Sequence, residues 1–349
     1  MERTQAIGWF GEVGLADRPL VGGKGGSLGE LTRADIAVPP GFVVATPAFD
    51  AFIAELEAHQ PVRATIEALD STDLASLTQV TSAIRERIER EPLPAALREA
   101  IGVAHARLCA GAATPVAIRS SATTEDAEDA SFAGLQDTYL WVTSLEDALT
   151  RIRSCWASLY SVESVGYRRR RAVPEAGVSM AVVVQRMVDA RTAGVMFTRS
   201  PLTGDRSVMT IEGAWGLGSA VVGGEVTPDR WVVGKITGEI TVRDVSDKQI
   251  EHRPRAGGGV ESLPTPPERS SEPCLNDDEL QALRAVGRRV EKHYGRPQDI
   301  EWAFEHGTNA LLLLQSRPET VWSAREAAPV ATAAADPRSH VMSIFGGRK

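Results

Sequence analysis

The chain contains 349 residues, of which 43% are hydrophobic and 24% are charged, and it carries a net charge of −8 at pH 7. This length accommodates two domains or two large subdomains, and the composition provides enough apolar material for sizeable cores. The acidic balance argues against nucleic acid or an anionic membrane as the main partner.

The cysteines and the N-terminus indicate the compartment. Cys109, Cys155 and Cys274 are widely spaced and form no CxxC pair, which favours a reducing environment over a disulfide framework or a zinc site. The N-terminal residues lack the apolar core of a signal peptide, and no run of about 20 apolar residues is present. We therefore expect a cytoplasmic protein that does not span a membrane.

The first unusual segment is a glycine-rich stretch around Lys24, from Pro19 to Gly29. We predict a flexible loop that leads into a short helix over residues 28–35. A Walker A motif is excluded, because position 18 is arginine and neither serine nor threonine directly follows the lysine. Backbone freedom around one cation suits a loop that covers phosphate, and a glycine-rich surface turn fits the same residues.

The rest of the first half is predicted to contain short strands and longer helical stretches. In chain order, the patterns indicate a strand over 42–45, mainly helix over 47–110, a buried strand over 116–118 that ends at Arg119, a helix over about 145–171, and a strand over 178–184 that reaches Gln185.

Arg119 is the first candidate for binding an anion. A buried strand that delivers an arginine to the edge of a loop suits this role, and a structural ion pair with an acid is the alternative. The loop of small and acidic residues that follows runs to Gly134, and Gly134 and Thr138 flank Gln136-Asp137. This segment fits either a loop that closes over a triphosphate or a plain β-turn.

The second half, from about Arg191, is rich in strands and turns. Residues 253–273 are rich in proline, glycine and serine and are interpreted as a surface loop. Asn276 then caps a helix that reaches about Tyr294, with Glu279 completing a capping box. The predicted strands before that loop cover 194–197, 207–212, 231–235 and 240–245, with a hairpin turn at 235–239.

Two further strands, over 298–304 and 311–318, are predicted to form a hairpin through the turn residues 305–309. Folding the chain within this turn places Glu301 opposite Gln315, or within one residue of it. The hairpin therefore brings an acidic residue and an amide together.

Side-chain alternation adds two more polar groups to this patch. Asp299 shares a face with Glu301, and Arg317 shares a face with Gln315. Carboxylate and amide oxygens suit Mg²⁺, and a neighbouring arginine suits a phosphoryl oxygen, so the patch is equipped for phosphoryl transfer from a nucleotide. Solubility and cross-strand pairing on an exposed strand face are the alternative explanation.

Several short strings occur together in one order and spacing. They are Val21-Gly22-Gly23-Lys24-Gly25, Ile118-Arg119-Ser120-Ser121-Ala122-Thr123, Ser131-Phe132-Ala133-Gly134-Leu135-Gln136-Asp137-Thr138, Val184-Gln185-Arg186-Met187, Ala193-Gly194-Val195-Met196-Phe197-Thr198, Trp215-Gly216-Leu217-Gly218, Val226-Thr227-Pro228-Asp229, Asp299-Ile300-Glu301-Trp302 and Gln315-Ser316-Arg317-Pro318. With these strings the chain resembles the ATP-binding (ATP-grasp) domain of the phosphoenolpyruvate synthase and pyruvate phosphate dikinase family. The motifs look most like those in the ATP domain of rifamycin phosphotransferases.

The resemblance implies an α+β chain with the ATP-grasp fold, in which the nucleotide binds in the cleft between two subdomains. These subdomains would be residues 1–190 and 191–325, followed by a flexible tail over 326–349.

The resemblance also implies a role for each matching residue. Lys24, Arg119 and Arg317 would hold the triphosphate and act in catalysis by stabilising charge on the transferring phosphoryl group. Gly134 and Thr138 would cover the phosphates. None of these positions is degraded, which argues against an inactive relative.

Other matching residues would lie around the nucleoside and the metal. Gln185 would lie near the nucleoside, and Glu301 and Gln315 would bind Mg²⁺. Glu212 and Asp299 would be polar residues of the cleft that support these groups.

The implied activity is that of the ATP-binding subunit or domain of a dikinase-type phosphotransferase, with ATP and Mg²⁺ as cofactors. The β-phosphoryl group would pass to a histidine on a separate carrier protein and then to a small acceptor such as pyruvate, a phenol or a rifamycin. A stand-alone ATP-binding subunit of this kind occurs in phenylphosphate synthase. Ser339-His340 lacks the preceding glycines of a carrier motif, so we do not take it as the carrier.

Two alternatives remain open from the sequence. One is a kinase that phosphorylates a small molecule directly, without a carrier. The other is a nucleotide-binding regulatory module without turnover. In every case we expect neither a nucleic acid nor a membrane as partner.

Overall fold

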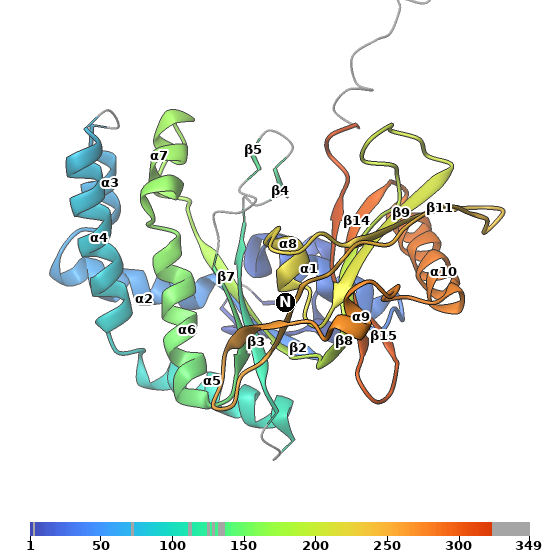
Figure 1. Cartoon of the computed structure of the whole chain (residues 1–349). Helices are drawn as coiled ribbons and strands as arrows, with labels where there is room; N and C mark the ends of the chain where they lie inside the picture. Colours follow the sequence, from blue (N-terminus) through green and yellow to red (C-terminus); the bar gives the residue numbers. More distant parts are fainter. Residues whose placement is uncertain are drawn as a thin grey trace, which may run out of the picture.

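The computed structural model of the chain describes residues 1–2, 4–70, 73–110, 114–123, 126–127, 130–131 and 137–322. Its strands form two large antiparallel sheets, and most of its helices lie on the outer sides of these sheets (Figure 1). The predicted tail over 326–349 lies outside the described residues.

The first half contains the first sheet. Its elements are β1 (Ile7–Trp9), the short 3-10 helices η1 (Phe10–Glu12) and η2 (Leu15–Asp17), α1 (Arg18–Arg33), β2 (Gly41–Val44), α2 (Thr46–His59), α3 (Arg63–Glu67), α4 (Leu74–Arg90), α5 (Ala95–Cys109), β3 (Val116–Ala122), β4 (Asp126–Ala127), β5 (Ala130–Ser131), β6 (Thr138–Val142), α6 (Leu145–Ser158), α7 (Val162–Arg170) and β7 (Met180–Arg186).

The second half contains the second sheet. Its elements are β8 (Ala190–Phe197), β9 (Val208–Trp215), α8 (Ser219–Val222), β10 (Asp229–Gly234), β11 (Ile240–Asp244), β12 (Ile250–Pro254), β13 (Val260–Pro264), α9 (Pro267–Ser270), α10 (Asp277–Tyr294), β14 (Gln298–Glu305) and β15 (Leu311–Pro318).

The first sheet has the order β1-β2-β7-β3-β6, and its central strands are buried on both faces. Runs of valine and isoleucine suit such strands. Ile118 and Val184 point to the face that packs against the helices α2 and α4–α6. Val183 points to the opposite face, where it packs with Val21 and Leu28 of α1.

The second sheet has the order β11-β10-β9-β8-β14-β15. One face is apolar: Trp231 and Trp302 pack there against Leu283 and Val290 of α10. The alternate residues of the same strands form the other face, which is half-buried and contains Glu301 among other polar side chains. The α+β class expected from the sequence is confirmed.

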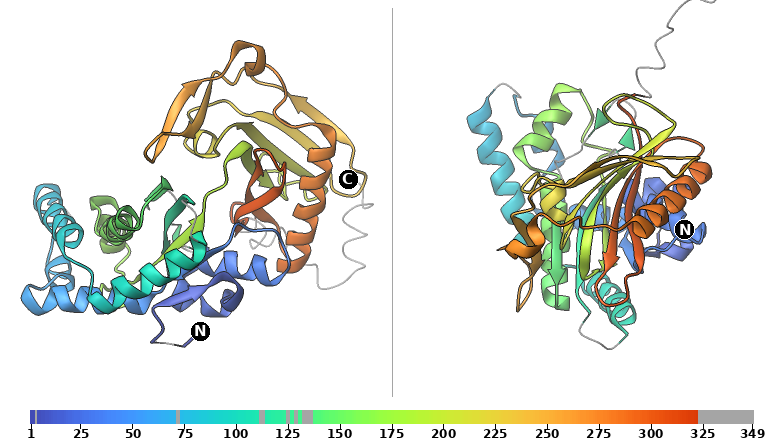
Figure 2. Two further views of the ribbon diagram at one scale, coloured as in Figure 1. Left: turned by 90° about the horizontal axis from the view of Figure 1, so that it is seen from below. Right: turned by 45° about the vertical axis from the view of Figure 1, so that its right-hand side comes forward.

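Helix α1 joins the two halves. It lies against β3 and β7 of the first sheet and against β15 of the second. Seen from below in Figure 2, the halves meet around α1, α10 and β15, while the β12–β13 hairpin extends from the second half toward the first.

The prediction of a flexible glycine-rich loop around Lys24 was wrong, because this stretch belongs to α1. The helix is interrupted at Gly22, which has φ 70° and ψ 179°. A Cβ on Gly22 would lie 2.1 Å from the carbonyl oxygen of Ser121, and one on Gly29 would lie 2.4 Å from the carbonyl oxygen of Val13. The glycines therefore permit close packing of backbone on backbone, which composition alone does not distinguish from flexibility.

The prediction of a surface loop over 253–273 was also wrong. Most of this stretch forms the β12–β13 hairpin and α9, and the pairing runs from Ile250 opposite Pro264 to Pro254 opposite Val260. The glycines 257–259 supply the turn, each with positive φ. The strands lack regular alternation of apolar and polar residues, so they gave no strand signal.

Several other boundaries differ in detail. The predicted helix over 145–171 is two helices, and α7 begins anew where the Ser161 side chain accepts a hydrogen bond from the backbone N–H of Ser164. β3 continues past Arg119 to Ala122, and β1 and β6 were not predicted. The capping box at Asn276 and the β14–β15 hairpin are confirmed.

Among the described residues, none of the helices has both the length and the apolar character that crossing a bilayer requires.

Candidate functional site

The β14–β15 hairpin has the register expected from its sequence. Glu301 lies opposite Gln315, and Asp299 lies opposite Arg317. The four side chains therefore share the face of the sheet that α10 does not cover.

A β-bulge next to this group redirects one carbonyl. The register shifts between Glu301 and Trp302, which pairs with Leu313, so Leu314 has no partner in β14. The Leu314 carbonyl oxygen instead accepts a hydrogen bond from Nη1 of Arg119 at 2.9 Å. The bulge thus joins β15 to β3 of the first sheet.

The Arg119 guanidinium connects the two halves at the predicted site. Its Nη2 donates to Glu301 Oε2 at 2.9 Å and to Gln315 Oε1 at 2.6 Å. Arg119 is only 9% exposed and Gln315 only 2%. Nε of Arg119 is buried and has no hydrogen-bond partner among the described residues. Three of the predicted site residues, from two different sheets, therefore lie in direct contact.

Residues of the other strands continue this face of the second sheet beyond Glu301. Neighbouring strands place Gln315, Glu301, Val195, Glu212 and Arg230 side by side in that order. Glu212 is two strands from Glu301, which corresponds to roughly 10 Å. Burial raises the pKa of the Glu212 carboxyl, and the Arg230 charge opposes this rise. Glu212 therefore shares the face with Glu301 without joining the Arg119 cluster.

Asp299 is the most perturbed acid of this face. Burial raises its pKa to about 6, with the Arg317 charge lowering it and the Glu319 charge raising it further. Its Oδ1 atom is buried and has no hydrogen-bond partner among the described residues. Arg317 thus lies close enough to Asp299 for its charge to act on the Asp299 carboxyl.

Thr138 lies beside the Arg119 cluster in the first half, and Lys24 lies near the segment that precedes Thr138. Thr138 is the neighbour of Arg119 across β3 and β6. Burial raises the pKa of the Cys155 thiol, the Asp137 charge raises it further, and the Lys24 ammonium lowers it. Lys24 therefore lies near the segment that leads into Thr138.

Ser121 fixes the part of α1 that carries Lys24. Its hydroxyl accepts a hydrogen bond from the backbone N–H of Gly25 at 3.1 Å and donates one to the Val21 carbonyl oxygen at 2.8 Å. Because these bonds span the interruption at Gly22, they hold the helix against β3 at this point.

Gln185 makes its hydrogen bond outside the Arg119 cluster. Gln185 lies opposite Ala117, on the same sheet face as Arg119, but its buried amide donates to the Pro39 carbonyl oxygen at 3.2 Å. Gly134, which was predicted to cover phosphates, lies outside the described residues.

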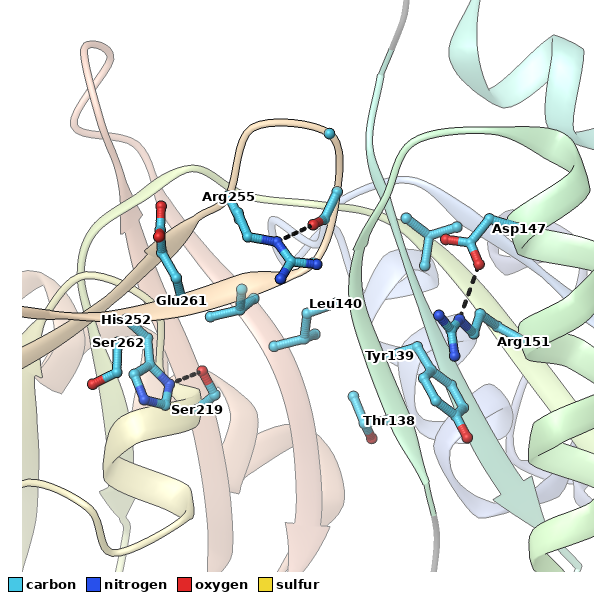
Figure 3. A pocket seen from close by; sticks show the side chains of 15 residues that line it. Thr138, Tyr139, Leu140, Asp147, Arg151, Ser219, His252, Arg255, Glu261 and Ser262 are labelled. Atoms are coloured by element: carbon cyan, nitrogen blue, oxygen red, sulfur yellow. Dashed lines mark hydrogen bonds and ion pairs between the residues drawn. The ribbon is translucent and has the colours of Figure 1, made fainter.

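A cavity of about 630 Å³ lies beside Thr138, between the two halves. Figure 3 shows Thr138 and Tyr139 of β6 on one side and Ser219 and His252 on the other. His252 has Nδ1 2.8 Å from the Ser219 hydroxyl and Nε2 3.3 Å from a carboxylate oxygen of Glu225. No histidine was predicted to have a role, and both ring nitrogens of His252 already have polar neighbours.

One backbone hydrogen bond joins the two halves beside this cavity. The backbone N–H of Gly259, in the turn between β12 and β13, donates to the Trp141 carbonyl oxygen at 3.0 Å. Trp141 has φ 57°, which is unusual for a bulky residue, and it lies where the β3–β6 register is irregular. The irregularity turns this carbonyl away from β3, so it can reach the second half of the molecule.

The oxygens around Arg119 suit Mg²⁺. The carboxylate of Glu301 and the amide oxygen of Gln315 converge on a single nitrogen, and both are ligand types that Mg²⁺ prefers. The described residues contain no group of three or more His, Cys, Asp or Glu that could hold a metal ion. A magnesium ion at this site would therefore also need water or substrate oxygens, as it does in many nucleotide sites.

Two contributors could not be identified as such from the sequence. Leu314 acts through a carbonyl that only the bulge exposes, and an apolar side chain gives no sign of this. Ser121 was noted only as a residue after Arg119, and its contact with α1 depends on packing between segments far apart in the chain.

The chain is similar to proteins of known family over most of its length. The family model for the pyruvate phosphate dikinase AMP/ATP-binding domain matches residues 18–337. A probable phosphoenolpyruvate synthase from Methanothermobacter thermautotrophicus is 43% identical over 317 residues, which cover 90% of this chain and 46% of that protein. A rifampicin phosphotransferase from Streptomyces sp. is 42% identical over 309 residues, which cover 88% of this chain and 35% of that protein.

A third relative, the phosphoenolpyruvate synthase from Aeropyrum pernix, is 39% identical over 357 aligned positions, which cover 93% of this chain and 43% of that protein. D-alanyl-alanine synthetase A from Vibrio cholerae, a solved structure, matches 82% of this chain and 52% of its own at 10% identity, but its TM-score of 0.27 supports no argument. The chain spans less than half the length of the three relatives. From the extent of the family match, the chain belongs to the pyruvate phosphate dikinase AMP/ATP-binding domain family.

Proposed function

We propose that this chain is the ATP-binding part of a dikinase-type phosphotransferase. It binds ATP with Mg²⁺ between its two halves and passes the β-phosphoryl group to a histidine on a separate carrier, while phosphate or water takes the γ-phosphoryl group and AMP is released. The carrier then phosphorylates a small acceptor. The observation that carries the proposal is the contact of Arg119 with Glu301 and Gln315. This contact brings together a cation from the first sheet and oxygen ligands from the second, and phosphoryl transfer needs both.

The residues around this contact have complementary roles in the proposal. Glu301 and Gln315 hold the metal, which would neutralise charge on the phosphates when bound. Lys24, Arg119 and Arg317 supply positive charge for the triphosphate, with Arg317 acting on the transferring group. Pyruvate, a phenol and a rifamycin remain the candidate acceptors.

ATP binding should depend on Mg²⁺. We expect the dissociation constant for ATP, measured by calorimetry, to rise roughly tenfold or more when EDTA replaces Mg²⁺, because the phosphates and the Glu301 oxygens share the ion. Glu301→Gln should remove most of this dependence. Glu305→Gln, a change on the same strand that spares the cluster, should retain it, and equal affinities with and without Mg²⁺ in the unaltered chain would contradict the metal assignment.

Phosphoryl transfer should require a separate carrier. We expect the chain alone to consume little ATP, and turnover to appear when a partner protein with a phosphorylatable histidine is added. The partner should acquire an acid-labile label from [β-³²P]ATP and none from [γ-³²P]ATP. Efficient phosphorylation of a small acceptor by the chain alone, with release of ADP, would instead establish the carrier-free kinase.

A further inference from the structure

The contacts of Arg119 concentrate a positive charge on the proposed metal ligands. One nitrogen, Nη2, contacts both Glu301 Oε2 and Gln315 Oε1, and the neighbouring Nη1 contacts the Leu314 carbonyl oxygen. Three oxygens from two strands are thus directed at one guanidinium. The Arg119 guanidinium therefore lies against the oxygens that would bind the metal ion.

These contacts satisfy oxygens that would otherwise be costly to bury. Gln315 is almost fully buried, and the Glu301 side chain is 22% exposed. A buried acceptor without a donor or a metal is unfavourable, and an isolated buried carboxylate more so. The guanidinium therefore keeps Glu301 and Gln315 in place while no metal is bound.

A metal ion and the guanidinium compete for the same oxygens. Mg²⁺ binds its oxygen ligands at about 2.1 Å and requires a nearly ideal geometry. Two cations this close in a partly buried site repel each other strongly. Metal binding to Glu301 Oε2 and Gln315 Oε1 together therefore requires the Arg119 guanidinium to move away from these two atoms.

The nucleotide offers the group that can receive the displaced arginine. Phosphate oxygens accept paired hydrogen bonds from a guanidinium, which makes arginine a preferred phosphate ligand. Nε of Arg119 is buried without a partner among the described residues, so a guanidinium that moved to phosphate would gain an acceptor for this donor. Metal alone brings no such acceptor.

We propose that Arg119 acts as an internal cation that holds Glu301 and Gln315 ready and excludes free metal until a nucleotide arrives. The proposal rests on the proposed function, in which these two residues bind Mg²⁺. It predicts that metal and nucleotide bind with positive coupling, because each favours the state in which Arg119 has moved to phosphate. By thermodynamic linkage, that coupling must be equal in both directions.

The test measures metal binding in the absence of nucleotide, with Mn²⁺ as the probe and its electron paramagnetic resonance signal as the readout. We expect the unaltered chain to bind Mn²⁺ weakly, and Arg119→Met to bind it about tenfold more tightly or better, because the competing charge is gone. The gain should disappear in the double variant Arg119→Met/Glu301→Gln. Arg119→Gln, which retains an amide donor for the Leu314 carbonyl, replaces Arg119→Met if that variant fails to fold.

Arg186→Met is the matched control. Arg186 also extends from the first sheet to β14, where its Nη2 lies 3.6 Å from Glu305, but it does not contact Glu301 or Gln315. The control removes the same charge between the halves, so it should not improve Mn²⁺ binding. An equal gain in this control would overturn the proposal.

Two further results would also overturn it. One is an unchanged Mn²⁺ affinity in the folded Arg119 variant. The other needs no Arg119 variant: the unaltered chain would bind Mn²⁺ tightly without nucleotide, and Glu301→Gln would abolish this binding. Calorimetry with ATP and Mg²⁺ on the unaltered chain tests the proposed function separately from the competition at Arg119. Absence of nucleotide binding would contradict the proposed function and not the competition.

Discussion

The Arg317→Ala variant is expected to lose phosphoryl transfer by on the order of 10³-fold, with a much smaller loss of ATP affinity. Arg317 lies opposite Asp299 on the face that carries Glu301 and Gln315. A guanidinium that acts on the transferring group contributes mainly in the transition state, so its removal lowers kcat more than binding. Turnover with the carrier and calorimetric ATP binding would be measured on the same preparation.

Two controls separate catalysis from structure in this experiment. Arg296→Ala removes an exposed arginine just before β14 and should leave turnover near normal. Arg317→Lys retains the positive charge beside Asp299 while losing the paired geometry of the guanidinium, so it should recover folding stability more than turnover. If Arg317→Ala retained near-normal turnover, its role would be limited to balancing the charge of Asp299.

The Gly22→Ala variant is expected to lose about 2–5 kcal/mol of unfolding free energy and to bind ATP poorly. The left-handed conformation at this position disfavours any residue with a Cβ, and the added atom would lie 2.1 Å from the carbonyl oxygen of Ser121. That oxygen belongs to the backbone of β3, so it cannot rotate away. Chemical denaturation gives the free energy, and calorimetry reports whether displacement of Lys24 weakens nucleotide binding.

Gly177→Ala provides the contrast for Gly22. A Cβ on Gly177 would meet no atom within 4 Å, and its backbone is not in the left-handed region. Alanine there restricts the unfolded chain and should leave stability unchanged or raise it by up to about 1 kcal/mol. If the Gly22→Ala variant were as stable as the unaltered chain, the positive-φ interruption at Gly22 would not be required for α1 to pack against β3.

The parts of the site that depend on local sequence could be predicted. Alternation along β14 and β15 and the turn between them determine which side chains share a face, so the pairing of Glu301 with Gln315 followed from the residues alone. The contact with Arg119 could not be derived in this way. It depends on how two sheets pack and on a bulge whose carbonyl belongs to Leu314.

Glycine caused the main errors because it serves two opposite purposes. Around Lys24 it was interpreted as freedom of the backbone, whereas Gly22 and Gly29 permit helix α1 to touch neighbouring backbone. In the β12–β13 hairpin, the glycines 257–259 do form a turn, but the strands beside them were hidden within the same biased composition. Only the neighbours of a glycine in space tell these uses apart.

The position of α1 also determines how the chain can be divided. Val21 and Leu28 belong to the core of the first half, but Leu31 belongs to the core of the second, and the Ser27 hydroxyl donates to the Ser316 carbonyl oxygen at 2.6 Å. Dividing the chain between β7, the last strand of the first sheet, and β8, the first strand of the second, would remove α1 from the second fragment. That fragment would then lack part of its hydrophobic core. The halves are therefore not separable modules, and any rotation between them must pivot on this shared helix rather than on the short connection between those strands.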